Sequence, residues 1–228
     1  MQYVIVGGSI AAASGLAAVR KNNPHAQIRV VADEPVPFYY RPLIPYLLDG
    51  SRTAEEILFT QHPAATGEAE MLHDQCLGID SEKRLLRLKS GKELAYGKLL
   101  VAAGGVPLLL LPDLAGVASE GVFTLRSMED AIQIRKYLLG CKTAAVIGGG
   151  LVGIKAAEAL QRAGLGVTVI EQQKQILPLR ADGVAAEAIA ERLMARGVTI
   201  LNEESPTEII ASTGKAEGVR LVSGKNKP

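Results

Sequence analysis

The sequence has few of the residues that build metal and redox centres. Its 228 residues include only two cysteines, Cys76 and Cys141, which form neither a CxxC nor a CxxxxC pair. This spacing argues against a zinc site or a local redox-active disulfide and is typical of a protein in a reducing cytoplasm. The three histidines, His25, His62 and His73, are scattered singly. We therefore expect no metal site and a cytoplasmic location.

The sequence also lacks an excess of charge of either sign. The formal net charge is +1 at pH 7, and 21% of the residues are charged. Surfaces that bind nucleic acids or membranes usually need clustered basic residues. Neither kind of partner is expected.

No stretch has the properties of a signal peptide or a transmembrane helix. The N-terminal MQYVIVGGS has no basic residue before its apolar part, so it predicts a buried strand. Residues 99–118 are strongly apolar, but glycine, proline and aspartate interrupt them. We interpret this stretch as a buried strand followed by an interdomain linker. The interrupting residues are Gly104, Gly105, Pro107, Pro112 and Asp113.

The N-terminal region predicts a strand, a tight turn, a helix and a second strand. A β-branched run at residues 3–6 leads into the small-residue turn 7–12, and an Ala-rich helix then runs to about Asn22. Residues 28–31 form the next predicted strand, with acids just after it. This is the layout of a dinucleotide-binding unit.

The same layout recurs in the second half of the chain. A strand at residues 144–147 precedes the turn GGGLVG at 148–153, and a helix runs on to about Ala163. The next strand, 167–170, ends directly before Glu171. The GxGxxG pattern is complete here, at Gly148, Gly150 and Gly153.

Each part of this second motif has a physical role in binding a dinucleotide. The first glycine makes the sharp turn, the second lets a pyrophosphate approach the backbone, and the third lets helix and strand pack closely. Free N–H groups at the helix start, at Leu151 and Val152, would bind the phosphates. Glu171 would accept hydrogen bonds from the ribose hydroxyls and repel a 2′-phosphate. NADH is therefore favoured over NADPH.

The first motif is less regular than the second. Gly7 is present, but Ser9 and Ala12 stand where the second and third glycines would be. Both side chains are small, so close approach of a ligand remains possible. A purely structural turn is the alternative, and the residues leave both interpretations open.

Two such units in one chain resemble the pyridine nucleotide-disulfide oxidoreductase superfamily. Three stretches carry the likeness. Residues 34–43 are similar to the family's E-P-x-x-x-Y-x-R-P-L, residues 99–107 to L-L-I-A-T-G-x-x-P, and residues 123–131 to the start of the NAD domain. In the last of these, Ser127 and Asp130 also predict a helix capping box. The nearest branch contains rubredoxin and ferredoxin reductases, NADH oxidases and the flavin part of assimilatory nitrite reductases.

The resemblance implies an α/β fold of two doubly wound, Rossmann-like nucleotide-binding domains. Residues 1–113 would form an FAD-binding domain and residues 114–228 an NAD-binding domain. The flavin would take a hydride from NADH and pass electrons to a redox protein or a small acceptor. FAD contacts are implied at Gly7, Ser9, Ala12, Asp33, Glu34, Arg41, Pro42, Cys76, Ala102 and Gly104.

Several residues depart from the family pattern. Pro42 stands where thiol-using relatives carry a redox cysteine, so electrons would leave directly from the flavin. Lys155 replaces a glutamate that lies near the nicotinamide in relatives, although a surface lysine is the alternative. With Arg41, it is our candidate for a residue near the reacting rings. Cys76 is expected at a strand end, and the alternative for its side chain is core filling. For the segment around Arg41, the alternative is a solvated loop.

The chain stops where relatives continue. They add the last strand of the NAD domain and a return segment that completes the FAD domain. We therefore expect an exposed sheet edge, which favours self-association or a complementing chain. The rival hypothesis is a non-catalytic nucleotide-binding module, or half of a split assembly.

Overall fold

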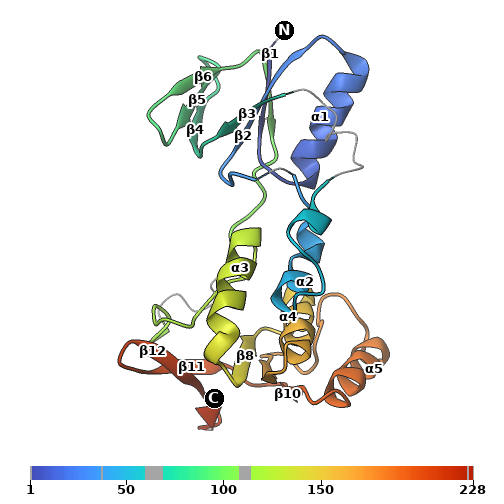
Figure 1. Cartoon of the computed structure of the whole chain (residues 1–228), viewed down its shortest axis with the longest axis vertical. Helices are drawn as coiled ribbons and strands as arrows, with labels where there is room; N and C mark the ends of the chain where they lie inside the picture. Colours follow the sequence, from blue (N-terminus) through green and yellow to red (C-terminus); the bar gives the residue numbers. More distant parts are fainter. Residues whose placement is uncertain (1, 37, 60–68, 108–113, 225, 228) are drawn as a thin grey trace. The chain divides into compact units, whose positions relative to one another are not determined.

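The computed structural model describes residues 2–36, 38–59, 69–107, 114–224 and 226–227, and the chain folds into two compact units (Figure 1). Unit 1 comprises Met1–Arg41 and Glu55–Val106. Unit 2 comprises Pro42–Ala54 and Pro107–Pro228. The predicted boundary at residue 113, with the linker residues 108–113, lies outside the described residues.

Unit 1 is built on a parallel sheet of four strands in the order β3-β2-β1-β7. The predicted strand–helix–strand of the N-terminal region is confirmed as β1, α1 and β2. Its elements are β1 (Gln2–Val6), α1 (Ile10–Asn22), β2 (Gln27–Ala32), β3 (Glu70–His73) and β7 (Lys98–Val101).

The two faces of this sheet are covered by different elements. Because side chains alternate along a strand, Ile5 faces α1 and packs with Leu16, whereas Val4 and Val6 face the opposite way. Leu86 and its neighbours in a three-stranded antiparallel sheet cover that second face. The covering strands are β4 (Cys76–Asp80), β5 (Leu85–Leu88) and β6 (Glu93–Ala95).

Two expectations for unit 1 were wrong in detail. The apolar segment that follows Lys98 is not a buried strand, because β7 pairs on one side only among the described strands, and Leu100 and Val101 are 39% and 57% exposed. Cys76 is the first residue of β4 instead of the end of a strand. It is partly buried against the cluster beneath the antiparallel sheet, in agreement with the core-filling alternative.

Unit 2 repeats the parallel plan with three strands in the order β10-β9-β8. The predicted strand, turn, helix and strand are confirmed. The helix α4 is amphipathic and buries Ile154, Ala157 and Leu160. The elements are β8 (Thr143–Ile147), α4 (Leu151–Arg162), β9 (Gly166–Ile170), α5 (Gly183–Met194) and β10 (Thr199–Leu201).

Two further elements complete unit 2. A second sheet packs Ile209, Val219 and Leu221 against Ile170 of the parallel sheet. It consists of β11 (Pro206–Ser212), β12 (Lys215–Leu221) and β13 (Asn226–Lys227). The helix α3 (Met128–Tyr137) begins at the capping box that Ser127 and Asp130 predicted.

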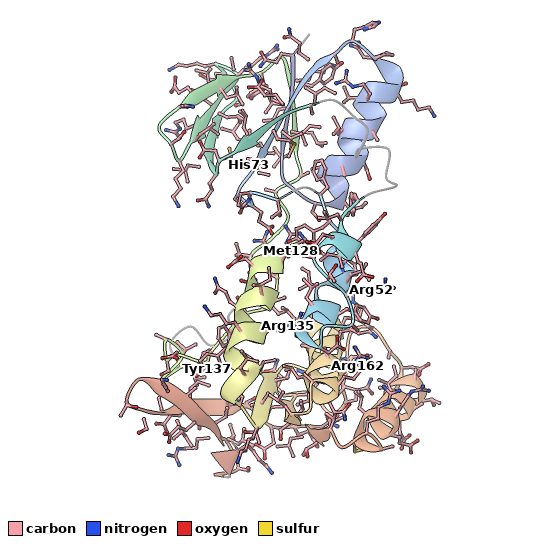
Figure 2. All side chains as sticks on the ribbon, in the orientation of Figure 1. Arg52, His73, Met128, Arg135, Tyr137 and Arg162 are labelled. Atoms are coloured by element: carbon pink, nitrogen blue, oxygen red, sulfur yellow. The ribbon has the colours of Figure 1, made fainter. Side chains whose placement is uncertain are left out.

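Residues 42–54 lie between β2 and β3 in the sequence but pack in unit 2. Their short helix α2 (Pro45–Leu48) contacts both α3 and α4, and Leu47 and Leu48 are buried. Figure 2 shows Arg162 on α4 and Arg135 on α3, the two helices that flank α2. The described residues include no helix long and apolar enough to cross a membrane.

An ion pair fixes this segment to α4. The Arg162 guanidinium Nε lies 2.5 Å from Asp49 Oδ2, and only 3% of the Asp49 side-chain surface is exposed. Ser51 also donates its backbone N–H and its hydroxyl to Asp49 Oδ1. Burial raises the pKa of the Asp49 carboxyl, but the bonds from Ser51 and Arg162 outweigh burial, and the pKa is lowered overall.

Asp49→Asn should therefore destabilise the chain in a pH-dependent way. At pH 7 we expect a loss of about 1–2 kcal/mol, because the partly buried Arg162 loses one of its two carboxylate partners and keeps Glu158. A carboxylate with a lowered folded-state pKa stabilises above its unfolded value and loses this effect as pH falls through the folded value. The difference from wild type in thermal unfolding should be full at pH 7 and shrink below about pH 4.

Glu208→Gln is the matched control, since it breaks an exposed pair with Arg220 in the same unit. It should cost under about 0.5 kcal/mol. A difference for Asp49→Asn that persists unchanged at pH 3 would contradict the assignment.

Candidate functional site

The glycine-rich turn of unit 2 is shaped by two close backbone approaches. Gly148 has φ +99, which an L side chain rarely adopts, and its N–H donates to Ile170 O at 2.8 Å. A Cβ on Gly153 would lie 2.0 Å from Gly148 O. These two glycines are therefore required by the fold of the turn.

The middle glycine of the pattern has no such structural reason. Gly150 has φ −73 and ψ 179, an extended conformation open to any residue, and a Cβ there would meet nothing within 4 Å. The open space lies at the start of α4, where Leu151 and Val152 are each 57% exposed. The fold does not require a glycine at position 150, but a ligand that approaches the backbone there would need this open space.

The helices differ in whether a side chain caps their first turn, and this difference favours a ligand at the start of α4. The α3 and α5 helices are capped by the side chains of Ser127 and Asp182. The helices that follow the two glycine turns, α1 and α4, have no side-chain hydrogen bond at their caps, Ser9 and Gly150, and no acid in their first turns. Their first N–H groups and the positive end of the helix dipole are thus available to an anion.

Glu171 closes the other side of this turn. It directly follows β9, and only 6% of the residue is exposed. Its Oε2 accepts from Gly149 N–H at 2.7 Å and its Oε1 from Gln173 N–H at 2.8 Å. Since each carboxylate oxygen can accept two hydrogen bonds, both retain capacity for a further donor.

The turn of unit 1 has the same backbone plan. Gly7 has φ +133, its N–H donates to Val31 O at 2.8 Å, and a Cβ would lie 2.1 Å from Ala102 O. Ser9 is the N-cap residue, and Ala12 in the third position is fully buried. The small residues in this turn therefore occupy the same places as the glycines of unit 2.

The acids of the two units are placed differently. By strand register, Ala32 in unit 1 corresponds to Glu171 in unit 2, because each follows the residue that accepts the turn's first N–H. Asp33 comes one residue later and is exposed, and Glu34 comes two residues later. Sequence reasoning did not detect this offset, since both acids simply follow a strand.

Glu34, Tyr39 and Arg41 form one cluster. The Tyr39 hydroxyl donates to Glu34 Oε2 at 2.5 Å, and the Arg41 guanidinium pairs with Glu34 Oε1. The Arg41 guanidinium carbon also lies 5.1 Å from the Tyr39 ring centroid. Tyr39 is only 1% exposed, so the solvated-loop alternative is wrong for it.

The other predicted FAD contacts are dispersed along the chain. Ala102 N–H donates to Val6 O at 2.7 Å, and Gly104 is exposed with φ +70. Pro42 is exposed and begins the segment that packs in unit 2. The described residues contain no group of acids, histidines or cysteines able to hold a metal.

Lys155 lies on α4, two residues beyond the GxGxxG turn. Its Nζ is 3.0 Å from Glu158 Oε2 and 5.8 Å from the Tyr46 ring centroid. The hydrogen bond to Glu158 raises the pKa of the Lys155 ammonium. Lys155 is exposed, in agreement with the alternative of a surface lysine on a helix, and its side chain belongs to a network that includes Arg162 and Arg196.

Sequence reasoning missed Tyr46, Asp49 and Arg162. Residues more than 100 positions apart come together here, as in the Asp49–Arg162 pair. No local pattern marks such a contact, because it depends on where residues 42–54 pack.

Comparisons with known proteins match nearly the whole chain. The profile of the family described as pyridine nucleotide-disulphide oxidoreductase matches residues 1–227. A rubredoxin-NAD(+) reductase from Pseudomonas putida is 31% identical over 232 residues, which cover 99% of this chain and 59% of that protein. An NADH oxidase from Methanocaldococcus jannaschii is 30% identical over 235 residues, covering 99% and 52%. The chain thus spans between half and two thirds of the length of these relatives.

Solved structures agree on the fold. A ferredoxin reductase from Rhodopseudomonas palustris matches with a TM-score of 0.89 and 25% identity, covering 100% of this chain and 56% of that one. The reductase–putidaredoxin complex gives a TM-score of 0.87 at 26% identity, covering 100% and 56%. Both parallel units therefore have the Rossmann-like fold of nucleotide-binding reductases.

Gly150→Ala and Gly153→Ala should separate ligand binding from folding. Gly150→Ala places its methyl group in open space, so thermal unfolding should be unchanged, while NADH affinity in a fluorescence titration falls at least about tenfold. Gly153→Ala pushes a methyl group into a backbone carbonyl and should destabilise the chain by about 1–3 kcal/mol. Wild-type NADH affinity in Gly150→Ala would contradict the ligand role of the open space.

Proposed function

Because the chain belongs to the pyridine nucleotide-disulphide oxidoreductase family, we propose that it is an FAD-dependent oxidoreductase that takes a hydride from NADH. Electrons would pass from the flavin to a redox protein or a small acceptor without a redox-active thiol. The observation that carries this proposal is the uncapped start of α4 beside the open space at Gly150, with Glu171 across the turn.

NADH fits the site in unit 2 by charge and by shape. The N–H groups of Leu151 and Val152 would bind the pyrophosphate, which could approach the backbone at Gly150. Glu171 would use the remaining lone pairs of its two oxygens to accept the ribose hydroxyls. A 2′-phosphate placed there would meet a buried carboxylate, and the neighbouring Gln172 and Gln173 carry no compensating positive charge.

FAD fits unit 1 by the same reasoning, with different neighbours. Gly7, Ser9 and Ala12 leave the start of α1 uncapped for its pyrophosphate. Asp33, being exposed one residue beyond the strand end, would reach the ribose, since Ala32 at the strand end cannot. The Glu34 carboxylate is bonded to Tyr39 and Arg41 and would orient that arginine. The remaining proposed FAD contacts are Pro42, Cys76, Ala102 and Gly104.

The protein's contribution to the reaction is positioning and electrostatics. When bound, the flavin supplies the chemistry, since it accepts a hydride and can release electrons singly. We place Arg41 and Lys155 near the reacting rings, where their positive charges would stabilise negative charge that develops there. Pro42 at the position of the redox cysteine in thiol-using relatives fits electron transfer directly from the flavin.

The relatives indicate which acceptors are reasonable. One is named for rubredoxin, and one solved structure is a covalent complex of a reductase with putidaredoxin. For this chain we propose a small redox protein or a small molecule as the acceptor, in the cytoplasm.

A second candidate function is a nucleotide-binding module that needs a complementing chain or a second copy. The edge strand β7 favours it, because Leu100 and Val101 are exposed there and the strand pairs on one side only within the described residues. Such an edge readily accepts another strand.

An absorbance spectrum of the purified chain, before and after anaerobic NADH, separates the two candidates. Flavin absorption that bleaches on addition of NADH is the result expected of the oxidoreductase. A colourless chain that takes up no added FAD, yet gains flavin when the C-terminal half of a relative is supplied, would support the module and overturn the enzyme for this chain alone.

Glu171→Gln should change coenzyme choice. The loss of a charge-assisted hydrogen bond to the ribose should weaken NADH binding about tenfold. NADPH binding should change less, because the repulsion of its 2′-phosphate is also removed. Fluorescence titrations with both nucleotides measure this ratio, and Glu187→Gln on the exposed face of α5 is the control. An unchanged NADH-to-NADPH ratio would exclude Glu171 as the discriminating residue.

A further inference from the structure

Tyr46 is the one aromatic residue of α2, and two cations of α4 lie over its ring. Lys155 Nζ is 5.8 Å and the Arg162 guanidinium carbon 5.6 Å from the ring centroid. Both distances are within the range of cation–π attraction. The ring thus contacts the helix whose first turn forms the proposed NADH site, although it comes from a segment more than 100 residues earlier.

The position of the ring is itself fixed. Leu47 and Leu48, next in α2, are buried, and the segment is anchored by the Asp49–Arg162 ion pair. The helix α2 contacts both α3 and α4, and a Cβ on Gly50 would lie 2.7 Å from the end of the Arg135 side chain of α3. The segment is therefore held by α3 and α4 together, and Tyr46 has a rigid support.

Lys155, in contrast, has a long side chain with many accessible rotamers. Its side chain has four rotatable bonds and is 49% exposed, so the position of the ammonium group depends on the contacts that it makes. Glu158 provides one anchor, but that carboxylate is also paired with Arg162 and Arg196, at 3.1 and 3.0 Å. The Tyr46 ring is the second anchor and comes from a different direction.

We propose that Tyr46 is a positioning residue of the NADH site, acting through Lys155. This inference rests on the proposed function, because it assigns Lys155 to the dinucleotide bound at the start of α4. With Tyr46 and Glu158 both in place, the ammonium is held beside the second and third turns of α4, and from there its positive charge attracts the anionic dinucleotide bound at the first turn. Without the ring, the Lys155 side chain would sample other rotamers, and its charge would contribute less to NADH affinity.

A double-mutant cycle on the full chain tests this, with NADH affinity measured by fluorescence titration. Lys155→Met and Tyr46→Leu should each weaken binding about threefold, the size expected of a cation–π contact and of one exposed charge. The double variant should be no weaker than either single variant, since Tyr46 has nothing left to position. Tyr46→Phe keeps the ring face but removes the hydroxyl, which also interacts with the Lys155 ammonium; if the ring is the anchor, this variant should bind NADH within about twofold of wild type.

The controls separate positioning from folding. Tyr137→Leu removes another partly buried tyrosine ring from unit 2, one that packs on Phe123, and should leave NADH affinity unchanged. The cycle is repeated with Tyr46→Met, whose flexible side chain fills the same space without a ring face, so that the test does not rest on the folding of a single variant.

Each outcome has a distinct meaning. Multiplying losses in the double variant, about ninefold if each single loss is about threefold, would mean that Tyr46 acts independently of Lys155 and would overturn the inference alone. So would wild-type affinity in both Tyr46→Leu and Tyr46→Met. If the wild-type chain binds no NADH at all, the proposed function and this inference fail together.

Discussion

The constraint on which both units depend is one backbone hydrogen bond between the glycine turn and the neighbouring parallel strand. In unit 1 the Gly7 N–H donates to Val31 O, and in unit 2 the Gly148 N–H donates to Ile170 O, each at 2.8 Å. The bond joins the turn to the neighbouring parallel strand. The chain then reverses direction into a helix, which requires a positive φ at the glycine. The start of the helix follows from this geometry in both units, whereas the acid across the turn belongs to unit 2 alone.

The same scaffold supports two different polar arrangements. In unit 2 the strand end itself carries Glu171, which is buried and bonded to the turn that it faces. In unit 1 that place belongs to Ala32, and the Glu34 carboxylate is directed to Tyr39 and Arg41 instead. Equivalent backbones therefore do not imply equivalent ligand contacts. The buried Glu171 carboxylate is suited to distinguish a free ribose from one that carries a 2′-phosphate. The Glu34 carboxylate is paired with Arg41 and is suited to orient that arginine.

The packing of residues 42–54 determines which side chains form the network on α4. The segment buries Leu47 and Leu48, and its Asp49 is almost inaccessible to solvent. Removal of such an acid would leave the guanidinium of Arg162 without its main partner, which is costlier than exposing a surface pair. The network also supplies the Lys155 ammonium with a counter-charge from Glu158 and with the electron-rich face of the Tyr46 ring.

The sequence by itself determined the strands and helices of the two glycine motifs, the capping box of α3 and the family, because each depends on local spacing and on the conformations available to glycine. It also located Glu171, whose place at a strand end follows from that spacing. Only the tertiary structure decided that β7 is an exposed edge, that Ala32 and not an acid ends β2, and that Tyr46 and Asp49 belong with α4. Burial, register across strands and contacts between distant segments depend on the path of the whole chain, which no short pattern encodes.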